Sequence, residues 1–203
     1  MTFGRQLAFT FVLLAASVQF ASAQSGDGWK VLLDGKSMDG WNKVGDTNWR
    51  VEDGAVVADK LGGKDAAFLV SKDKYKDFQL VIEFWASNDA NSGIYMRCAD
   101  RKNLNDKSCY EANIFDQRPD QTYATGGIVH RGRLLTPVKA GGKWNVYEIA
   151  ARGSKLTVVL NGTKTSEFDK VESPSGPIAL QFGNQPKSPG GAIKFRKVQI
   201  KPL

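Results

Sequence analysis

Several residue types and patterns are scarce in this chain, and each scarcity excludes a class of protein. There are two cysteines and one histidine, too few to form a structural zinc site by themselves. The sequence has no Gly-x-Ser-x-Gly elbow, no phosphate-binding glycine-rich loop ending in Lys-Ser/Thr and no His-Glu-x-x-His. Serine hydrolases, nucleotide-dependent enzymes and zinc proteases that use these motifs are therefore set aside.

The chain also lacks an apolar run of the roughly twenty residues that a membrane-spanning helix needs. The apolar stretch 7–16 is about half that length. It follows the basic residue Arg5 and precedes the small residues Ala21, Ser22 and Ala23. This pattern predicts a secretory signal peptide over residues 1–23 and a mature domain over 24–203, located in the periplasm or secreted. Stable membrane insertion is not expected.

Size and charge are those of one ordinary domain. Removal of residues 1–23 from the 203 leaves 180 residues, enough to bury a substantial core. Only Arg5 is lost from the charge count, so the mature chain has 27 basic and 21 acidic residues, a net charge of +6. Because the basic residues are spread along the chain rather than gathered in a run, nucleic-acid binding is not expected. The oligomeric state is left open.

The two cysteines are Cys98 and Cys109. In an exported protein an even count predicts a disulfide. Both lie at the inner ends of expected strands, so the bridge would close a small loop and contribute on the order of 3 kcal/mol.

An all-β fold is predicted, because short β-branched and aromatic segments alternate with Gly, Pro, Asn and Asp clusters. The clearest hairpin joins 155–160 to 164–168 through Asn161-Gly162, which tolerates the positive φ angles of a tight turn. Further strands are expected at 49–57, 78–85, 94–98, 110–115, 127–130, 145–151, 178–182 and 192–200. About ten strands in a chain of this size predict an antiparallel two-sheet sandwich.

Polar side chains gather on two of these expected strands. Alternation places Tyr95 and Arg97 on one face of the first strand, and Glu111 and Asn113 on one face of the second. If the two strands pair as a hairpin next to the disulfide, the four side chains share one face of the sheet. Such a cluster suits a sugar site, and a structural Arg–Glu pair on a solvent-exposed face is the alternative.

Other residues could take part in chemistry. His130, the only histidine, is a candidate for proton transfer near neutral pH, although a histidine at a strand end is often incidental. A glycosidase mechanism with the two carboxylates of Glu111 and Asp116 is disfavoured, because an offset of five residues puts them on opposite faces of a strand.

Tryptophans could stack on sugar rings, although in a sandwich most of them belong to the core. One of Trp41, Trp49, Trp85 and Trp144 is expected in a site. Trp85 is favoured, because it lies on the polar side of its strand.

Nine short motifs, in their order along the chain, resemble the 3-keto-disaccharide hydrolase domain family. They lie at 29–41, 49–54, 91–97, 110–116, 125–126, 144–145, 160–162, 176–181 and 195–196. The resemblance covers nearly all of the mature chain. It implies a concanavalin A-like jelly-roll sandwich with a site on its concave sheet, and activity on glycosides whose sugar is oxidised at C3.

The resemblance also implies a chemistry. A ketone at C3 acidifies the C2 proton, so a base can remove it, the enolate can expel the C1 substituent, and water can add to the enone. Glu111 or His130 would be the base, Arg97 would stabilise the enolate oxygen, and Asp116 would position or protonate the substrate. A divalent metal could replace Arg97 in that role, with Glu111, Asp116 and His130 as ligands.

The substrate is expected to be a carbohydrate or glycoside. Its expected contacts are Trp85, Asn91, Tyr95, Asn113 and Gln181. Two places depart from the family pattern: Asn113 stands where glutamine is common, and 182–184 stands where a His-Gly pair is common. The alternative function is a non-catalytic carbohydrate-binding module that uses the same face, and a third is a structural envelope protein.

Overall fold

The structure is a computed structural model that describes residue 26 and residues 28–183 and 191–203. The expected signal peptide over residues 1–23 lies outside the described residues. The described residues form strands and a single short 3-10 helix, η1 (Gln121–Tyr123). The prediction of an all-β fold is therefore confirmed.

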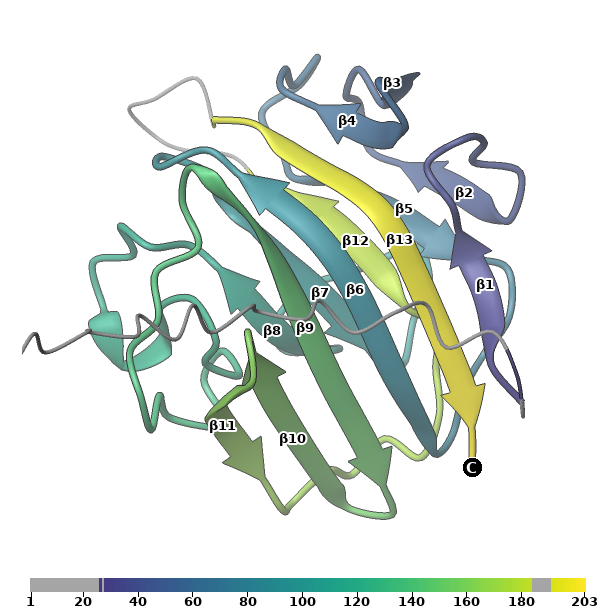
Figure 1. The fold of residues 1–203 in the computed structure, drawn as a ribbon. Coiled ribbons are helices and arrows are strands. Elements are labelled where there is room, and N and C mark those ends of the chain that lie inside the picture. The colour runs from purple at the N-terminus through teal and green to yellow at the C-terminus, as the bar shows by residue number, and fades with distance from the viewer. Residues whose placement is uncertain (1–25, 27, 184–190) are drawn as a thin grey trace, which may run out of the picture.

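The strands form two antiparallel sheets that pack face to face (Figure 1). The eight-stranded sheet has the order β11-β10-β9-β6-β13-β4-β3, with β1 paired to β13, and the five-stranded sheet has the order β2-β5-β12-β7-β8. In chain order the strands are β1 (Lys30–Leu33), β2 (Trp41–Val44), β3 (Arg50–Glu52), β4 (Ala55–Ala58), β5 (Ala67–Ser71), β6 (Phe78–Ala86), β7 (Ser92–Met96), β8 (Tyr110–Ile114), β9 (Lys143–Arg152), β10 (Lys155–Leu160), β11 (Thr163–Phe168), β12 (Ala179–Phe182) and β13 (Ile193–Pro202).

The core lies between the two sheets. Along β6, Phe78, Leu80, Ile82 and Phe84 are fully buried, while the residues between them face outward and are partly exposed. This alternation has the period of two that a strand with one buried face requires. β6 therefore stands at the centre of the eight-stranded sheet, paired with β9 on one side and β13 on the other.

Most of the five-stranded sheet is covered on both faces. Every residue of β5, β7, β8 and β12 is buried. Its outer face carries a second apolar cluster of Phe68, Val70, Tyr95, Ala179 and the two cysteines, against which Leu104 packs. The loop between β7 and β8 thus forms a third layer over part of this sheet.

Some expected strands differ from those observed. The expected strand 49–57 is a hairpin of β3 and β4, because Asp53 and Gly54 adopt positive φ angles of 50° and 73° and reverse the chain. Segment 127–130 makes only isolated bridges, through Ile128. β1, β2 and β5 were not expected. β5 has no alternation to detect, since all five of its residues are buried.

The Asn161-Gly162 hairpin is confirmed. Both residues have positive φ, at 51° and 78°, and β10 pairs with β11 across them.

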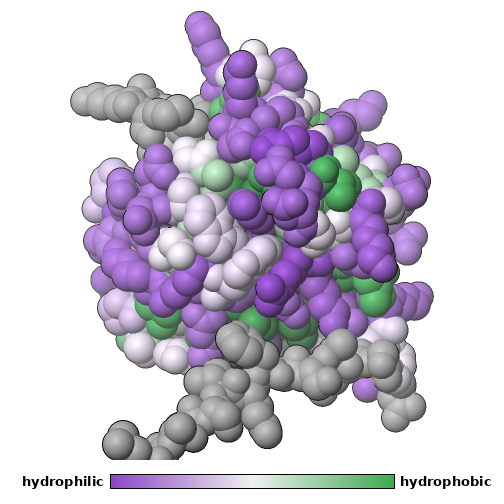
Figure 2. All heavy atoms as spheres, turned by 45° about the horizontal axis from the view of Figure 1, so that its top comes forward, coloured by the Kyte–Doolittle hydropathy of each residue, from purple (hydrophilic) through white to green (hydrophobic). Residues whose placement is uncertain are grey.

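The surface in view in Figure 2 is mostly hydrophilic, with small scattered hydrophobic areas. Among the described residues, the exposed large hydrophobic side chains are Val31, Val51, Leu135 and Leu203. The described part of the chain also has no helix with the length and apolar character needed to cross a bilayer.

Candidate functional site

Three polar side chains, joined by hydrogen bonds, lie in a row across the outer face of the five-stranded sheet. Gln181 on β12 donates from Nε2 to Tyr95 Oη on β7 (3.0 Å), and Tyr95 Oη donates to Glu111 Oε2 on β8 (2.9 Å). Tyr95 and Glu111 are directly opposite each other in the β7–β8 register. The three side chains are only 4–7% exposed. The predicted grouping of Tyr95 with Glu111 is therefore found.

A glycine makes room for the Glu111 carboxylate. Gly93 lies on β7 opposite Asn113, and a Cβ built on it would lie 2.4 Å from Glu111 Oε1. Since real Cβ atoms do not approach other heavy atoms so closely, any larger residue at this position would push the carboxylate away. Gly93 thus allows Glu111 to lie flat over β7.

The environment of Glu111 changes its acidity. Burial raises the pKa of the Glu111 carboxyl to about 7, against the opposing effects of the Tyr95 hydrogen bond and the Arg118 charge. Burial also raises the pKa of Tyr95 well above its usual value, so that its phenol stays protonated and remains a donor. The site therefore holds a carboxyl group that can both give and take a proton near neutral pH.

Several buried polar atoms near these three side chains have no hydrogen-bond partner. They are Gln181 Oε1, Asn113 Oδ1 and Arg118 Nε. Asn113 is 1% exposed, and its Nδ2 donates to the carbonyl of Tyr123. Buried polar atoms are nearly always paired in native proteins, so these acceptors beside Glu111 hold hydrogen-bonding capacity that the described residues leave unused.

His130 lies at the rim rather than beside Glu111. Its side chain is 56% exposed, and its Nε2 is 3.1 Å from Asp106 Oδ2, in the loop between β7 and β8. Its ring packs edge-on against Tyr123 at 5.5 Å. A backbone hydrogen bond connects the segment that carries His130 to the strand that carries Glu111, since Val129 N donates to Glu111 O.

Two charged residues of the site were missed by sequence reasoning. Asp106 pairs with His130 and raises the pKa of Glu111, whereas the half-buried Arg118 lowers it. Neither lies on a strand, so alternation cannot detect it. The available signal for Arg118 was its position in the loop that directly follows the strand carrying Glu111.

The expectation that Arg97 shares a face with Glu111 is wrong. Arg97 directly follows β7 and has a positive φ of 48°, which breaks the alternation. Its guanidinium is fully buried, with Nε donating to Lys76 O (2.8 Å), Nη1 to Gly153 O (2.6 Å) and Nη2 to Asp77 Oδ1 (2.9 Å). Arg97 therefore ties the five-stranded sheet to the start of β6 and the β9–β10 turn, and does not contact Glu111.

Asp116 also has a structural environment. Its carboxylate accepts hydrogen bonds from Thr125 Oγ1 (2.6 Å), Ala140 N (3.0 Å) and Gly141 N (2.9 Å). These bonds hold the segment after β8 against the segment before β9. With its oxygens occupied in this way, Asp116 is not placed to position or protonate a substrate.

The hypothesised metal ligands do not come together. Glu111 is bonded to Tyr95, Asp116 to backbone N–H groups, and His130 to Asp106. Within the described ranges, no group of three or more His, Cys, Asp or Glu side chains is arranged to hold a metal ion. Glu111, Asp116 and His130 are therefore not arranged as ligands of one metal ion.

The tryptophans lie away from the Glu111 face. Trp41 and Trp49 belong to the core. Trp85 pairs with Trp144 across β6 and β9 on the outer face of the eight-stranded sheet, with Lys194 5.4 Å from its ring centroid. The expectation that Trp85 lies in the same site as Glu111 is wrong, because β6 belongs to the other sheet.

Asn91 precedes β7 at the edge of the site. Its backbone oxygen accepts from Gly183 N (2.8 Å), directly after β12, the strand that carries Gln181. The predicted disulfide between Cys98 and Cys109 is present. It joins the ends of β7 and β8 and closes the loop that carries Asp106.

Comparisons with known proteins identify the family of this chain. The model of a family described as the 3-keto-alpha-glucoside-1,2-lyase-like domain matches residues 28–201. A 3-keto-disaccharide hydrolase of Bacteroides thetaiotaomicron is 33% identical over 78 residues, which are 34% of this chain and 27% of that protein. The match thus spans about a quarter of that relative's length.

Solved structures show the same fold. A candidate glycosyl hydrolase of Parabacteroides distasonis superposes with a TM-score of 0.68 at 24% identity, over 87% of this chain and 100% of that chain. The carbohydrate-binding module CBM66 of Bacillus subtilis superposes with a TM-score of 0.60 at 15% identity, over 80% of this chain and 95% of the module.

The two antiparallel sheets and these neighbours define a jelly-roll sandwich of the concanavalin A-like class. Within that class, the chain belongs to the 3-keto-alpha-glucoside-1,2-lyase-like domain family, whose model matches nearly all of its described part.

Proposed function

We propose that this protein cleaves 3-keto-glycosides by elimination followed by hydration. The observation that carries the proposal is the Glu111 carboxyl, buried beside Tyr95 with its pKa raised to about 7. Proton abstraction next to a ketone needs such a base, whose pKa lies near the working pH. Membership of the family and the relative named 3-keto-disaccharide hydrolase support the choice of substrate.

In the first half of the reaction, the Glu111 carboxylate takes the C2 proton of the sugar. The C–H electrons form the C2–C3 double bond of an enolate, and the C3 oxygen becomes negative. Arg118, whose Nε has no partner in the protein, donates to this oxygen. Arg118 thus takes the role that the resemblance assigned to Arg97.

In the second half, the enolate re-forms the ketone, a C1–C2 double bond appears, and the C1–O bond to the aglycone breaks. His130 at the rim, paired with Asp106, gives the leaving oxygen its proton. Water then adds to C1 and gives up a proton to His130, while Glu111 returns its proton to C2, so both groups regain their starting states. The products are the aglycone alcohol and a free 3-keto sugar.

The unpaired oxygens of Gln181 and Asn113 orient the substrate in this proposal. Both are acceptors, so they suit hydroxyl groups of the sugar, which can donate. The Tyr95 hydroxyl holds the Glu111 carboxylate in place through its hydrogen bond. The Cys98–Cys109 disulfide supports a location in the periplasm or outside the cell, because such bonds persist in oxidising compartments. A carbohydrate is the only partner that this mechanism requires.

The test measures aglycone release from α- and β-linked aryl 3-keto-glucosides by the mature protein, with and without chelator. Glu111→Gln is expected to lower kcat/KM by about 10²–10⁴-fold, the usual contribution of a general base. The matched control is Glu172→Gln, which changes an exposed carboxylate and should leave the rate unchanged. Loss of release on addition of chelator would contradict the role of Arg118 at the enolate oxygen.

Isotopic substitution distinguishes elimination from direct hydrolysis. A substrate deuterated at C2 should react several-fold more slowly, because the C2–H bond breaks in the first step. An unchanged rate in single-turnover measurements would contradict the elimination mechanism. Arg118→Gln and His130→Ala should each lower the rate, and His130→Ala should matter least for an aglycone that leaves without a proton.

A non-catalytic carbohydrate-binding role is the second candidate. The unpaired acceptors of Gln181 and Asn113 favour it as much as they favour an enzyme, and CBM66 shares the fold. No release from any 3-keto-glycoside, together with binding of unoxidised oligosaccharides that Glu111→Gln leaves intact, would establish this function instead.

A further inference from the structure

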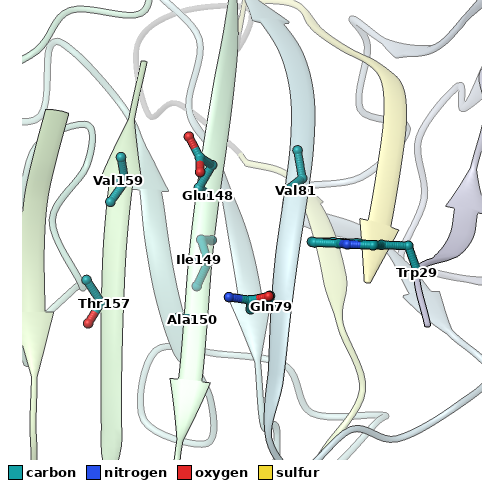
Figure 3. A pocket seen from close by; sticks show the side chains of 8 residues that line it. All are labelled: Trp29, Gln79, Val81, Glu148, Ile149, Ala150, Thr157 and Val159. Carbon is teal, nitrogen blue, oxygen red and sulfur yellow. The ribbon is translucent and has the colours of Figure 1, made fainter. Parts of the chain in front are cut away.

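A hollow lies on the other sheet, away from Glu111. It is on the outer face of the eight-stranded sheet and has a volume of about 320 Å³, at the lower end of the range for ligand sites. Figure 3 shows that its lining comes from β6, β9 and β10 and from Trp29, which precedes β1. The hollow plays no part in the proposed reaction.

The register of the strands builds the floor of the hollow in two rows. Across β6, β9 and β10, Val81 is opposite Glu148, and Glu148 is opposite Val159. One step along the strands, Ala150 stands between Gln79 and Thr157. Because Ala150 carries only a methyl group between two longer side chains, the sheet surface is lowest there.

Trp29 forms one side of the hollow. In Figure 3 its indole extends across the sheet toward Val81 and is seen edge-on, so a ring face is turned along the strands. Trp29 is partly exposed, and so are Gln79, Val81, Ala150, Thr157 and Val159. An aromatic face beside a mixed apolar and polar floor can contact the C–H face of a sugar ring while polar groups receive its hydroxyls.

We propose that this hollow binds a neutral sugar unit of an oligosaccharide or polysaccharide. The Trp29 indole stacks against the ring, Val81 and Val159 contact its apolar face, and Gln79, Glu148 and Thr157 exchange hydrogen bonds with its hydroxyls. Among the described residues that line the hollow, Glu148 is the only charged side chain. A carboxylate there disfavours anionic sugars, which is why the proposal commits to a neutral one.

This site would act independently of Glu111, because the two lie on outer faces of opposite layers. A glycan held on the eight-stranded sheet raises the local concentration of neighbouring sugar chains for the other face. The inference stands on the hollow alone and does not require that Glu111 is catalytic.

The experiment uses the mature Glu111→Gln protein, so that cleavage cannot occur. Backbone amide signals are followed by NMR during titration with unoxidised cellopentaose, maltopentaose and laminaripentaose. At least one is expected to bind with a dissociation constant on the order of 1 mM, and to shift signals at 79–81, 148–150 and 157–159.

Three substitutions localise the binding. Trp29→Ala removes the stacking face and Ala150→Trp fills the hollow, and each should weaken binding by about tenfold or more. The matched control is Trp144→Ala, which removes an indole from the same sheet face outside the hollow. Thermal unfolding of each variant shows whether it remains folded. If Trp29→Ala does not fold, Ala150→Trp still tests the hollow.

Four results would overturn the proposal. The first is no binding of any of the three sugars. The second is a set of shifts confined to residues around Glu111, which would place the sugar in the first site. The third is equal weakening by Trp144→Ala. The fourth is a dimer in solution that Ala150→Trp dissociates, which would make the hollow a contact between copies of this chain.

Discussion

The β7–β8 hairpin holds a buried cation and a buried anion, and the protein treats them in opposite ways. The three nitrogens of the Arg97 guanidinium each donate a hydrogen bond, and one of the three acceptors is the Asp77 carboxylate. Within the described part of the chain, the only side-chain hydrogen bond to Glu111 comes from Tyr95, and the neighbouring oxygens of Gln181 and Asn113 are unpaired. Both groups are thus buried. They differ in how many hydrogen-bond partners surround them, and this difference distinguishes a structural group from a reactive one.

The largest expected effect tests the structural side of this comparison. Arg97→Met should lower the free energy of unfolding by about 3–5 kcal/mol, because it leaves the Asp77 carboxylate without its charged partner and two backbone carbonyls without their donor. Urea denaturation measures the loss. The control is Arg101→Met, whose arginine makes one long hydrogen bond, to Ser71 O at 3.4 Å, and should cost under about 1 kcal/mol. Similar values for the two variants would remove the distinction drawn for Arg97.

The next effect tests the reactive side through pH. Burial raises the pKa of Glu111 from 4.5 to about 7, so the folded protein binds this proton more tightly than the unfolded chain. Below about pH 4.5 the group is protonated in both states and costs nothing. Stability then falls as pH rises toward 7, and above that the penalty reaches at most roughly 3 kcal/mol.

Glu111→Gln isolates this penalty. The difference in free energy of unfolding between the variant and the unchanged protein should grow in favour of the variant from pH 5 to pH 8. A difference that stays constant over this range would mean that Glu111 titrates at its ordinary pKa. In the same range, the rise of kcat/KM of the unchanged protein toward pH 7 should follow the loss of the Glu111 proton.

A smaller loss is expected at Asp116. Asp116→Asn places an N–H₂ group against the N–H groups of Ala140 and Gly141, and should lower stability by about 1–3 kcal/mol. Chemical denaturation measures it, with Asp120→Asn as the exposed control. Activity per folded molecule should change little. A loss of activity as large as that of Glu111→Gln, without a loss of stability, would return Asp116 to the reacting groups.

The smallest effect sharpens the comparison at the hairpin itself. Gly93→Ala should lower kcat/KM by about tenfold, because its Cβ displaces the Glu111 carboxylate. Gly63→Ala is the control, since a Cβ there meets nothing within 4 Å. Stability should fall by about 1 kcal/mol, because the Cβ would also lie 2.8 Å from Glu111 Cγ, and this buried side chain must shift to make room. Unchanged kinetics in Gly93→Ala would show that the position of Glu111 is not critical.

Local patterns predicted much of this molecule. Alternation found β6, β9 and β13, turn chemistry found the Asn161-Gly162 hairpin, and the cysteine count found the disulfide. The Tyr95–Glu111 pair followed from alternation along two strands that are neighbours in sequence. These features depend on interactions between residues that are close along the chain, where period and residue type carry the information.

Other features had no local signal. β5 is apolar throughout because both of its faces are covered, and a uniform run has no period. The position of Arg97 depends on Asp77 and Gly153, which are distant in sequence and meet it only after the sheets pack. The same holds for Arg118 and Asp106, which reach the site from loops.

By itself, the sequence determined an all-β sandwich, its central hairpins, the disulfide and the strand pair that carries the candidate base. Only the tertiary structure decided which buried charge is satisfied, that Trp85 lies on the opposite sheet from Glu111, and that Trp29 meets β6, β9 and β10 at a hollow. The reason is physical. Alternation assigns a side chain to a face of its own strand, whereas its partners, and hence its pKa and availability, are set by segments that arrive from elsewhere in the chain.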